Sequence, residues 1–358
     1  MRHLAALLPL LTLLAACSNK PVPPAETPHG NPFKGGFLLA PGNAGSLPNG
    51  DFASNPNAVR FVDKMVREHG FDRQQLHDVL AQTQRLDWVL RLMDRQAPSS
   101  LPPSGPNGAW LRYRSKFITP DNVQNGVAFW NQYNDALQRA WREYGVPPEI
   151  IVGIIGVETR WGRVMGKTRI IDALATLAFD YPRRADYFTG ELETFLLMAR
   201  SEGDDPLALR GSYAGAMGYG QFMPSSFKSY AVDFDGDGHI NLWDPVDAIG
   251  SVANYFKAHG WTKDGAVAVP ASGQAPFMEY GFNSHYPLSA LSAAGLAPQG
   301  ALGNYQEAGL LRLDIGSGYQ YWYALPNFYT ITRYNHSIHY AMAVWQLGTA
   351  VGRARQGN

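Results

Sequence analysis

The sequence predicts a mainly helical α+β protein that carries a small antiparallel sheet. Apolar residues recur at helical spacing between residues 57 and 92 and again between residues 127 and 144. Two short runs between residues 310 and 325 are rich in β-favouring residues with partial alternation. A helical pattern then returns at residues 337–351. Because this last helix can pack back on the main core, we expect the sheet to be an insertion.

Composition narrows the class of protein. The chain has 358 residues, 45% of them hydrophobic and 12% aromatic, which is enough to bury a sizeable core. Thirty basic residues balance thirty acidic ones, so the net charge gives no attraction to nucleic acid. We expect no nucleic-acid partner. The single cysteine excludes an intramolecular disulfide, so packing has to stabilise the fold, with a metal ion as one further source of stability.

The first 16 residues have the anatomy of a secretion signal. Arg2 precedes an apolar run that is too short to span a bilayer well. The ending Leu-Ala-Ala-Cys17 resembles a bacterial lipobox, which would make Cys17 the acylated first residue of the mature protein. Ser18 lacks the acidic character associated with inner-membrane retention. We therefore expect an outer-membrane lipoprotein facing the periplasm of a Gram-negative bacterium; a chance cysteine in a cleaved signal is the alternative.

Glu158 is a carboxylate on the expected buried face of an apolar helix. Residues 147–162 read as that helix, with two prolines suited to its first turn and isoleucines four and eight residues before the acid. Burial disfavours the charged carboxylate and raises its pKa, as a general acid near neutral pH requires. The alternative is a structural ion pair with Arg160 or Arg163 at the helix end.

Residues 233–244 match the spacing of an EF-hand calcium loop. Calcium takes roughly six to eight hard oxygen ligands, and the backbone carbonyl at the seventh position is one of them, so His239 need not bind through its ring. Asp244 occupies the twelfth position, where glutamate is usual. Because the aspartate side chain is shorter, bidentate binding of the ion by both of its carboxylate oxygens is in doubt. We expect the loop to bind a structural Ca²⁺, although the sequence does not distinguish calcium from sodium. We expect no organic cofactor. The expected ligands are Asp233, Asp235, Asp237, His239, Asn241 and Asp244.

Glycines crowd residues 211–224, between the acid and this loop. They let the backbone approach a ligand closely, while Ser212 and Gln221 offer hydrogen bonds beside apolar side chains. The segment fits the wall of a sugar-binding site. A tightly packed glycine turn is the alternative.

Four of these features occur together in one order. They are Glu158-Thr-Arg-Trp-Gly162, Gly218-Tyr-Gly-Gln-Phe-Met-Pro224, the 233–244 loop and Arg333-Tyr-Asn-His-Ser337. The sequence from about residue 61 to residue 351 thereby resembles the membrane-bound lytic murein transglycosylase B family. The resemblance implies a goose-type-lysozyme-like core with an EF-hand loop, an accessory helical region and a small β region around a peptidoglycan groove.

The resemblance and the composition together suggest an order of regions. We expect a signal peptide at 1–16, a lipidated flexible tether at 17–50, an accessory helical region at 51–145, the lysozyme-like catalytic core at 146–262, a small β region at 263–332, and a C-terminal helix returning to the core at 333–358.

The implied reaction cleaves the β-1,4 bond between N-acetylmuramic acid and N-acetylglucosamine without adding water. Glu158 would protonate the leaving oxygen and then deprotonate the muramoyl 6-hydroxyl, which closes a 1,6-anhydro ring. The residues are consistent with this, because ordinary glycosidases use two carboxylates and no second one lies near Glu158 in sequence. Asp172 and Asp180 could still approach it in three dimensions.

The resemblance also implies sugar contacts by Ser212 and Gln221. The other implied contacts of the groove are the aromatics Tyr113, Tyr255, Tyr334 and Tyr340, with Asn335 beside them, and Arg183 and Arg184 for stem-peptide carboxylates. These residue types suit the role, since aromatic faces pack on sugar rings and arginine binds carboxylates. Buried core tyrosines and a solvated arginine pair are the alternatives.

Two rival functions fit the same residues. A lysozyme-type hydrolase would need a second carboxylate across the cleft, and a non-catalytic, calcium-stabilised module would bind peptidoglycan without cleaving it. We expect glycan strands as the substrate and the outer membrane as the site of anchoring. We expect a monomer and leave open whether other cell-wall enzymes are partners.

Overall fold

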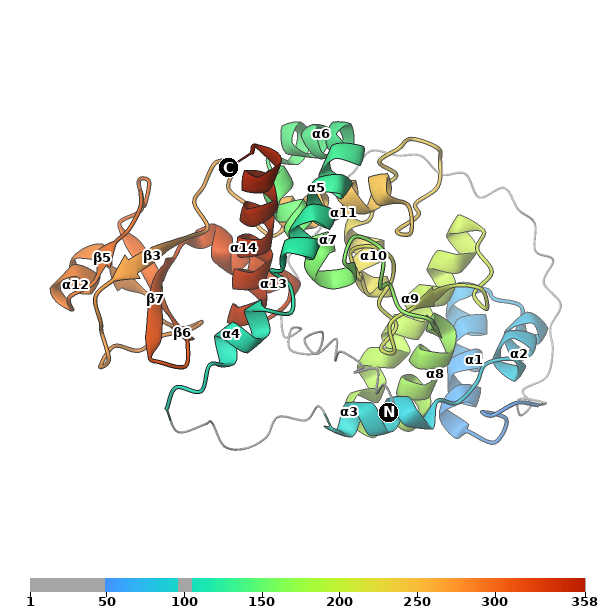
Figure 1. Cartoon of the computed structure of the whole chain (residues 1–358). Coiled ribbons are helices and arrows are strands. Elements are labelled where there is room, and N and C mark those ends of the chain that lie inside the picture. The colour runs from blue at the N-terminus through green and yellow to red at the C-terminus, as the bar shows by residue number, and fades with distance from the viewer. Residues whose placement is uncertain (1–48, 96–104, 358) are drawn as a thin grey trace, which may run out of the picture.

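Helices dominate the computed structural model, which describes residues 49–95 and 105–357 (Figure 1). The predicted signal, most of the tether and Cys17 lie outside the described residues. The α+β, mainly helical fold class is confirmed. The division into domains remains a prediction. Among the described residues, no helix combines the length and the apolar character that crossing a membrane would require.

Most of the described helices precede or follow the five-stranded sheet in the chain, and α12 lies between two of its strands. They are α1 (Pro56–His69), α2 (Arg73–Ala81), α3 (Asp87–Arg95), α4 (Ala109–Arg114), α5 (Pro120–Gln132), α6 (Asn134–Tyr144), α7 (Pro148–Thr159), α8 (Ile170–Asp180), the 3-10 turn η1 (Pro182–Arg184), α9 (Ala185–Glu202), α10 (Pro224–Tyr230), α11 (Pro245–Ala258), α12 (Leu288–Ala293), α13 (Pro326–Tyr334) and α14 (Ile338–Arg355).

The strands of the described residues form two sheets. They are β1 (Thr168–Arg169), β2 (Arg210–Gly211), β3 (Ala268–Ser272), β4 (Tyr286–Pro287), β5 (Ala297–Pro298), β6 (Glu307–Asp314) and β7 (Tyr319–Ala324). β1 pairs with β2, and the other five form an antiparallel sheet in the order β4-β6-β7-β3-β5. The expected small antiparallel sheet is therefore present, between α11 and α13 in the chain.

The α7 helix lies at the centre of the helical body. Its residues are apolar all round, and everything from Ile150 to Thr159 is buried, as a helix surrounded by other elements requires. The predicted helix extended to residue 162, but α7 ends at Thr159. Arg160 and Trp161 adopt left-handed backbone conformations, which turns the chain away, and the indole of Trp161 donates back to the Val152 carbonyl at 3.2 Å.

Two glycines bring α14 against α7. A Cβ at Gly153 would lie 2.3 Å from the carbonyl oxygen of Val344 on α14, and one at Gly348 would lie 1.9 Å from that of Glu149 on α7. Since real Cβ atoms do not approach this closely, only glycine fits at either position. The C-terminal helix can therefore pack directly on α7.

The pattern over residues 127–144 is divided in the structure between two helices. Tyr133 leaves the helical region with φ −111° and ψ 26°, ending α5 and preceding α6. Its ring packs 4.8 Å from that of Phe129. Hydrophobic periodicity continues across the break, because both helices bury apolar residues in the same core.

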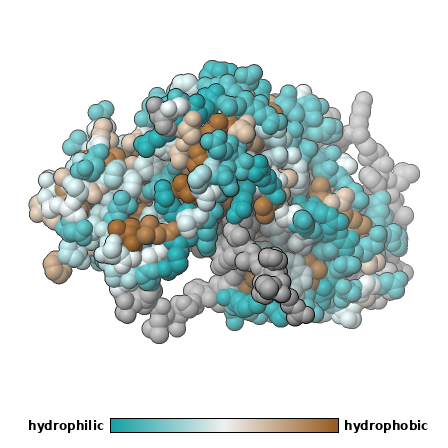
Figure 2. Space-filling model, in the orientation of Figure 1, coloured by the Kyte–Doolittle hydropathy of each residue, from teal (hydrophilic) through white to brown (hydrophobic). Residues whose placement is uncertain are grey.

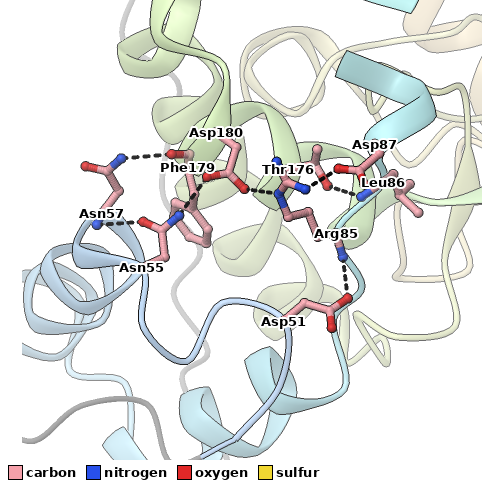
Figure 3. Close-up of polar contacts among 9 residues, drawn as sticks. All are labelled: Asp51, Asn55, Asn57, Arg85, Leu86, Asp87, Thr176, Phe179 and Asp180. Atoms are coloured by element: carbon pink, nitrogen blue, oxygen red, sulfur yellow. Dashed lines mark hydrogen bonds and ion pairs between the residues drawn. The ribbon is translucent and has the colours of Figure 1, made fainter. Parts of the chain in front are cut away.

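Polar contacts attach the N-terminal helices to α8 (Figure 3). Asp180 at the end of α8 accepts a hydrogen bond from Asn55 at 2.8 Å with one carboxylate oxygen. Its other oxygen accepts from Arg85 Nε at 2.6 Å. The backbone N–H of Arg85 donates to Asp51 at 2.9 Å. These contacts hold the loops around α1–α3 on the side of the body shown at the right of Figure 1.

The sheet buries both of its faces. Alternate residues of β7 point to opposite sides, so Tyr321 and Tyr323 join a small core of the sheet region whereas Trp322 joins the main core. The Trp322 ring lies 5.5 Å from that of Trp345 on α14, edge to face. The sheet is thereby packed against the helix that also contacts α7.

Candidate active site

Glu158 is buried at the end of α7 and is held by a residue from the far end of the chain. Its carboxylate is reached by the hydroxyl of Tyr340, which donates to Oε1 at 2.5 Å. Tyr340 lies in the first turn of α14, where the Ser337 hydroxyl caps the helix by accepting the Tyr340 N–H at 3.2 Å. The cap and the close α7–α14 contact fix the position of the phenol.

Burial raises the pKa of Glu158 from 4.5 to about 7, and the hydrogen bond from Tyr340 opposes this by favouring the carboxylate. The group can therefore hold a proton near neutral pH and also release it, as an acid that later acts as a base must. Glu158 is only 5% exposed and makes no ion pair with any described residue, so the alternative of pairing with Arg160 or Arg163 is wrong.

The two candidate second carboxylates are engaged elsewhere. Asp172 accepts hydrogen bonds from Arg169 at 2.7 Å and from the Gln84 N–H at 2.9 Å. Asp180 is bound by Asn55 and Arg85, as shown in Figure 3. Burial and Tyr340 account for the pKa of Glu158, with no contribution from a neighbouring carboxylate. The geometry leaves Glu158 to act without a carboxylate partner.

Two more of the expected tyrosines lie next to this pair. Tyr334 donates to the Gly220 carbonyl at 2.5 Å, and its ring packs edge to face on Tyr255 at 4.8 Å. Tyr255 in turn donates to the Arg333 carbonyl at 2.7 Å. Burial, with the nearby Glu158 charge, raises the pKa of Tyr334 well above its usual value, and the same causes raise that of Tyr340. Both phenols therefore remain hydrogen-bond donors.

The glycine-rich segment closes around Gln221. Its backbone is left-handed, with φ 53°, and its amide nitrogen donates to the Gly218 carbonyl at 2.8 Å. Its Oε1 is buried and accepts no hydrogen bond from a described residue. Ser212 is buried too, and its hydroxyl accepts the Ala216 N–H at 2.9 Å. Tyr334 ties this segment to α13 through Gly220.

Asn335 presents unused hydrogen-bonding capacity. The side chain is 4% exposed, and neither its amide oxygen nor its amide nitrogen has a partner among the described residues. Because a buried amide without a partner is costly, these atoms are available to a ligand or a water molecule. Tyr113 comes from α4, and its ring lies 5.6 Å from that of His339, the residue before Tyr340.

The two arginines contact α3 and α9. Arg183 is exposed and lies 4.0 Å from Asp94 on α3, while Arg184 packs over the ring of Tyr187 at 4.3 Å. Their role toward stem peptides remains a prediction.

The acidic loop gathers three carboxylates. Asp233, Asp235 and Asp237 place ligand oxygens within 4.8 Å of one another, and all three side chains are exposed. The Asp233 carboxylate accepts the N–H groups of Gly236 and Gly238 at 2.7 and 2.9 Å. Partial desolvation opposes ionisation, but these donors outweigh it and lower the pKa of Asp233. Ionised oxygens clustered on a tight loop fit a hard cation such as Ca²⁺.

The other expected ligands follow on the same loop. His239 is exposed and donates its N–H to Asp237 at 2.8 Å, and Asn241 accepts the Trp243 N–H at 2.9 Å. Asp244 caps α11 by accepting the Val246 N–H at 2.6 Å. One of its oxygens thus has a structural task, in keeping with the short reach of aspartate at this position.

Asp247 was missed by sequence reasoning. It is 1% exposed and accepts N–H groups from Phe234 at 2.7 Å and Asn241 at 2.8 Å, so it holds both ends of the acidic loop from inside. Its position in the first turn of α11 was the available signal, because acids are favoured there.

A buried acid with a raised pKa on a central helix, held by a phenol donor, fits a lysozyme-like enzyme that cleaves glycans. Comparison with known proteins agrees. The Transglycosylase SLT domain family matches residues 53–349, and the chain belongs to this family. It is a peptidoglycan-cleaving lytic transglycosylase. The predicted resemblance is confirmed, and the hydrolase and the binding module are set aside.

Individual relatives are similar over most of their length. The membrane-bound lytic murein transglycosylase B of Escherichia coli (strain K12) is 74% identical over 357 residues, which cover 99% of each chain. The E. coli lytic transglycosylase SLT35 in complex with bulgecin A is 77% identical with a TM-score of 0.83, covering 86% of this chain and 96% of that one. Its complex with calcium is 76% identical with a TM-score of 0.82, at the same coverage.

A more distant relative also has the fold. SltB3 of Pseudomonas aeruginosa in complex with NAG-anhNAM-pentapeptide is 30% identical with a TM-score of 0.72, covering 82% of this chain and 78% of that one.

The raised pKa of Glu158 predicts a pH-dependent gain in stability for Glu158→Gln. Between pH 4.5 and about 7, rising pH ionises Glu158 in the unfolded chain before the folded one, so the wild type loses stability. The Gln variant lacks this titration. Its advantage in unfolding free energy should grow by about 3 kcal/mol between about pH 4 and about pH 8, measured by urea unfolding. Parallel pH dependences would show that Glu158 titrates normally.

Proposed function

We propose that Glu158 is the only acid/base of the transglycosylase reaction and that its burial against Tyr340 makes this possible. The observation that carries the proposal is a buried carboxyl that accepts a hydrogen bond from Tyr340, and burial raises its pKa to about 7 with no contribution from a neighbouring carboxylate. A hydrolase with two carboxylates would divide the acid and base roles between them. Here one group performs both.

The reaction proceeds in two proton transfers. Protonated Glu158 gives its proton to the glycosidic oxygen as the bond to the muramoyl anomeric carbon breaks, which releases the 4-hydroxyl of the N-acetylglucosamine unit. The Glu158 carboxylate then takes the proton of the muramoyl 6-hydroxyl, whose oxygen bonds to the anomeric carbon. The acid is regenerated and no water is consumed. Tyr340 steadies the carboxylate between the two steps through its hydrogen bond.

The polar groups around Glu158 form the sugar-binding wall. The unpaired oxygen of Gln221 and both amide atoms of Asn335 suit the N-acetyl and hydroxyl groups of the sugars. Ser212, Tyr113, Tyr255 and Tyr334 complete the wall.

The acidic loop is proposed to hold a structural Ca²⁺. The carboxylates of Asp233, Asp235 and Asp237 would bind it, with the carbonyl of His239 and the side chains of Asn241 and Asp244 as further ligands. When bound, the ion would neutralise the clustered negative charge. SLT35, a relative 76% identical to this chain, was solved in complex with calcium.

Anchoring at Cys17 is part of the proposal. The E. coli relative that is 74% identical over 99% of the chain is described as membrane-bound. The lipobox-like sequence supplies a chemical basis, since several acyl chains hold a protein firmly on a bilayer. The expected location is the periplasmic face of the outer membrane. We also propose that the protein is a monomer and that other cell-wall enzymes recruit it. These two proposals are based on the sequence alone.

Product analysis tests the role of Glu158. Protein lacking the anchor is incubated with purified peptidoglycan, and soluble products are analysed by mass spectrometry beside those of Glu158→Gln. The wild type should release muropeptides lighter by one water than hydrolytic products. The variant should release none, because its amide cannot donate the proton. Residual anhydro products at the wild-type rate would exclude Glu158 as the acid.

The calcium proposal predicts that Asp237→Ala lowers the melting temperature by several degrees in calcium and far less in chelator, since the lost ligand acts only when the ion is bound. The control is Asp78→Ala, which removes an exposed carboxylate on α2. Equal shifts in melting temperature with and without chelator would contradict a bound ion.

A further inference from the structure

The small sheet region carries a group of four aromatic side chains and one arginine, here called the Tyr280 platform, in which two aromatics are exposed and the other members are partly buried. It consists of Phe277, Tyr280, Phe282, Arg312 and Tyr319. Phe277 is fully exposed and Tyr280 is 46% exposed. Figure 2 shows hydrophobic side chains at the surface of the sheet region, at the left of the molecule. Two large exposed aromatics three residues apart on one loop offer apolar surface to a ligand.

Arg312 holds the two tyrosines of the platform in place. Its guanidinium carbon lies 3.6 Å from the ring centre of Tyr280 and 4.1 Å from that of Tyr319. It also donates a hydrogen bond to the Tyr280 hydroxyl. A cation packed on aromatic faces restricts their rotation. The rings are therefore ordered before any ligand arrives, which lowers the entropic cost of binding.

The loop that carries the platform is fixed to β6. The Gly281 N–H donates to the Leu310 carbonyl at 2.8 Å, and the Leu310 N–H donates to the buried hydroxyl of Ser284 at 2.9 Å. Ser284 in turn donates to the Gly281 carbonyl at 2.8 Å. Main-chain and side-chain bonds thus hold residues 281–284 as a rigid base beneath Tyr280.

Two contacts link the platform region to segments that carry residues of the proposed sugar-binding wall. Phe282 stacks on His336 at 3.9 Å with an interplanar angle of 11°, and His336 directly follows Asn335. At the other side, the Asp314 carboxylate accepts the Gly108 N–H at 2.8 Å, which ties the β6–β7 hairpin to the start of α4. Tyr113 lies on α4, so both edges of the platform lead to residues of the wall.

We propose that the Tyr280 platform is a second sugar-binding surface, which binds the glycan strand of the substrate beyond the units held at Glu158. The proposal rests on the proposed function and deepens it. Sugar rings present apolar faces that pack on Tyr280 and Phe277, and Arg312 suits the carboxylates of stem peptides. Glu279, within the same loop, disfavours insertion into an anionic membrane surface.

The test compares long glycan strands with a short tetrasaccharide as substrates for Phe277→Ala/Tyr280→Ala. KM for long strands should rise roughly 5- to 10-fold with kcat unchanged, because two ring contacts are lost only where the strand reaches them. Turnover of the tetrasaccharide should not change. The matched control is Trp88→Ala, which removes an aromatic residue of α3 that is 44% exposed.

Binding of the same strands to the Glu158→Gln protein separates this proposal from the proposed function. A triple variant combines Glu158→Gln with Phe277→Ala and Tyr280→Ala. If it retains long strands less well than Glu158→Gln alone, the proposed second sugar-binding surface is supported. Equal retention and equal KM values overturn it. Cleavage by Glu158→Gln would instead refute the role of the acid. If the platform variant loses binding to anionic phospholipid vesicles while its KM for long strands is unchanged, the surface contacts membrane and the proposal is wrong.

Discussion

The close contact between α7 and α14 is the constraint on which the site depends. Gly153 and Gly348 let each backbone approach the carbonyls of the other helix, where any Cβ would collide. At this spacing the Tyr340 hydroxyl reaches Glu158, although 182 residues separate them. A wider spacing would leave the buried carboxyl without its donor, and a buried ionised group without one is strongly disfavoured.

Other parts of the chain converge on α14 as well. The inserted sheet packs Trp322 against Trp345, and α4 brings Tyr113 against His339. The residues that surround the acid therefore come from α4, the glycine-rich segment, α13 and α14. None of these segments could form the candidate site alone, because the side chains around the acid come from distant parts of the chain.

Sequence reasoning found what is encoded locally. An acid ending an apolar stripe identified Glu158, and the Asp and Gly spacing of residues 233–244 identified the acidic loop. It did not find what depends on packing: Asp247 anchors that loop by accepting hydrogen bonds from backbone N–H groups, and its place in the first turn of α11 indicates only that an acid is favoured there. The resemblance suggested Tyr340 as a groove aromatic, but only the fold reveals its bond to Glu158. Likewise, the hydrophobic periodicity of residues 127–144 continues through Tyr133, where α5 ends. Periodicity indicates which residues are buried and does not indicate where a helix ends.

The most direct test of the account is the pH titration of the Glu158 carboxyl by NMR, using glutamate labelled with carbon-13 at the carboxyl and assigned by its loss in Glu158→Gln. The account predicts a pKa of about 7 in the wild type. It predicts a higher pKa in Tyr340→Phe, because the bond that favours the carboxylate is removed. A wild-type value near 4.5, or no change in Tyr340→Phe, would contradict a buried acid controlled by the α7–α14 contact.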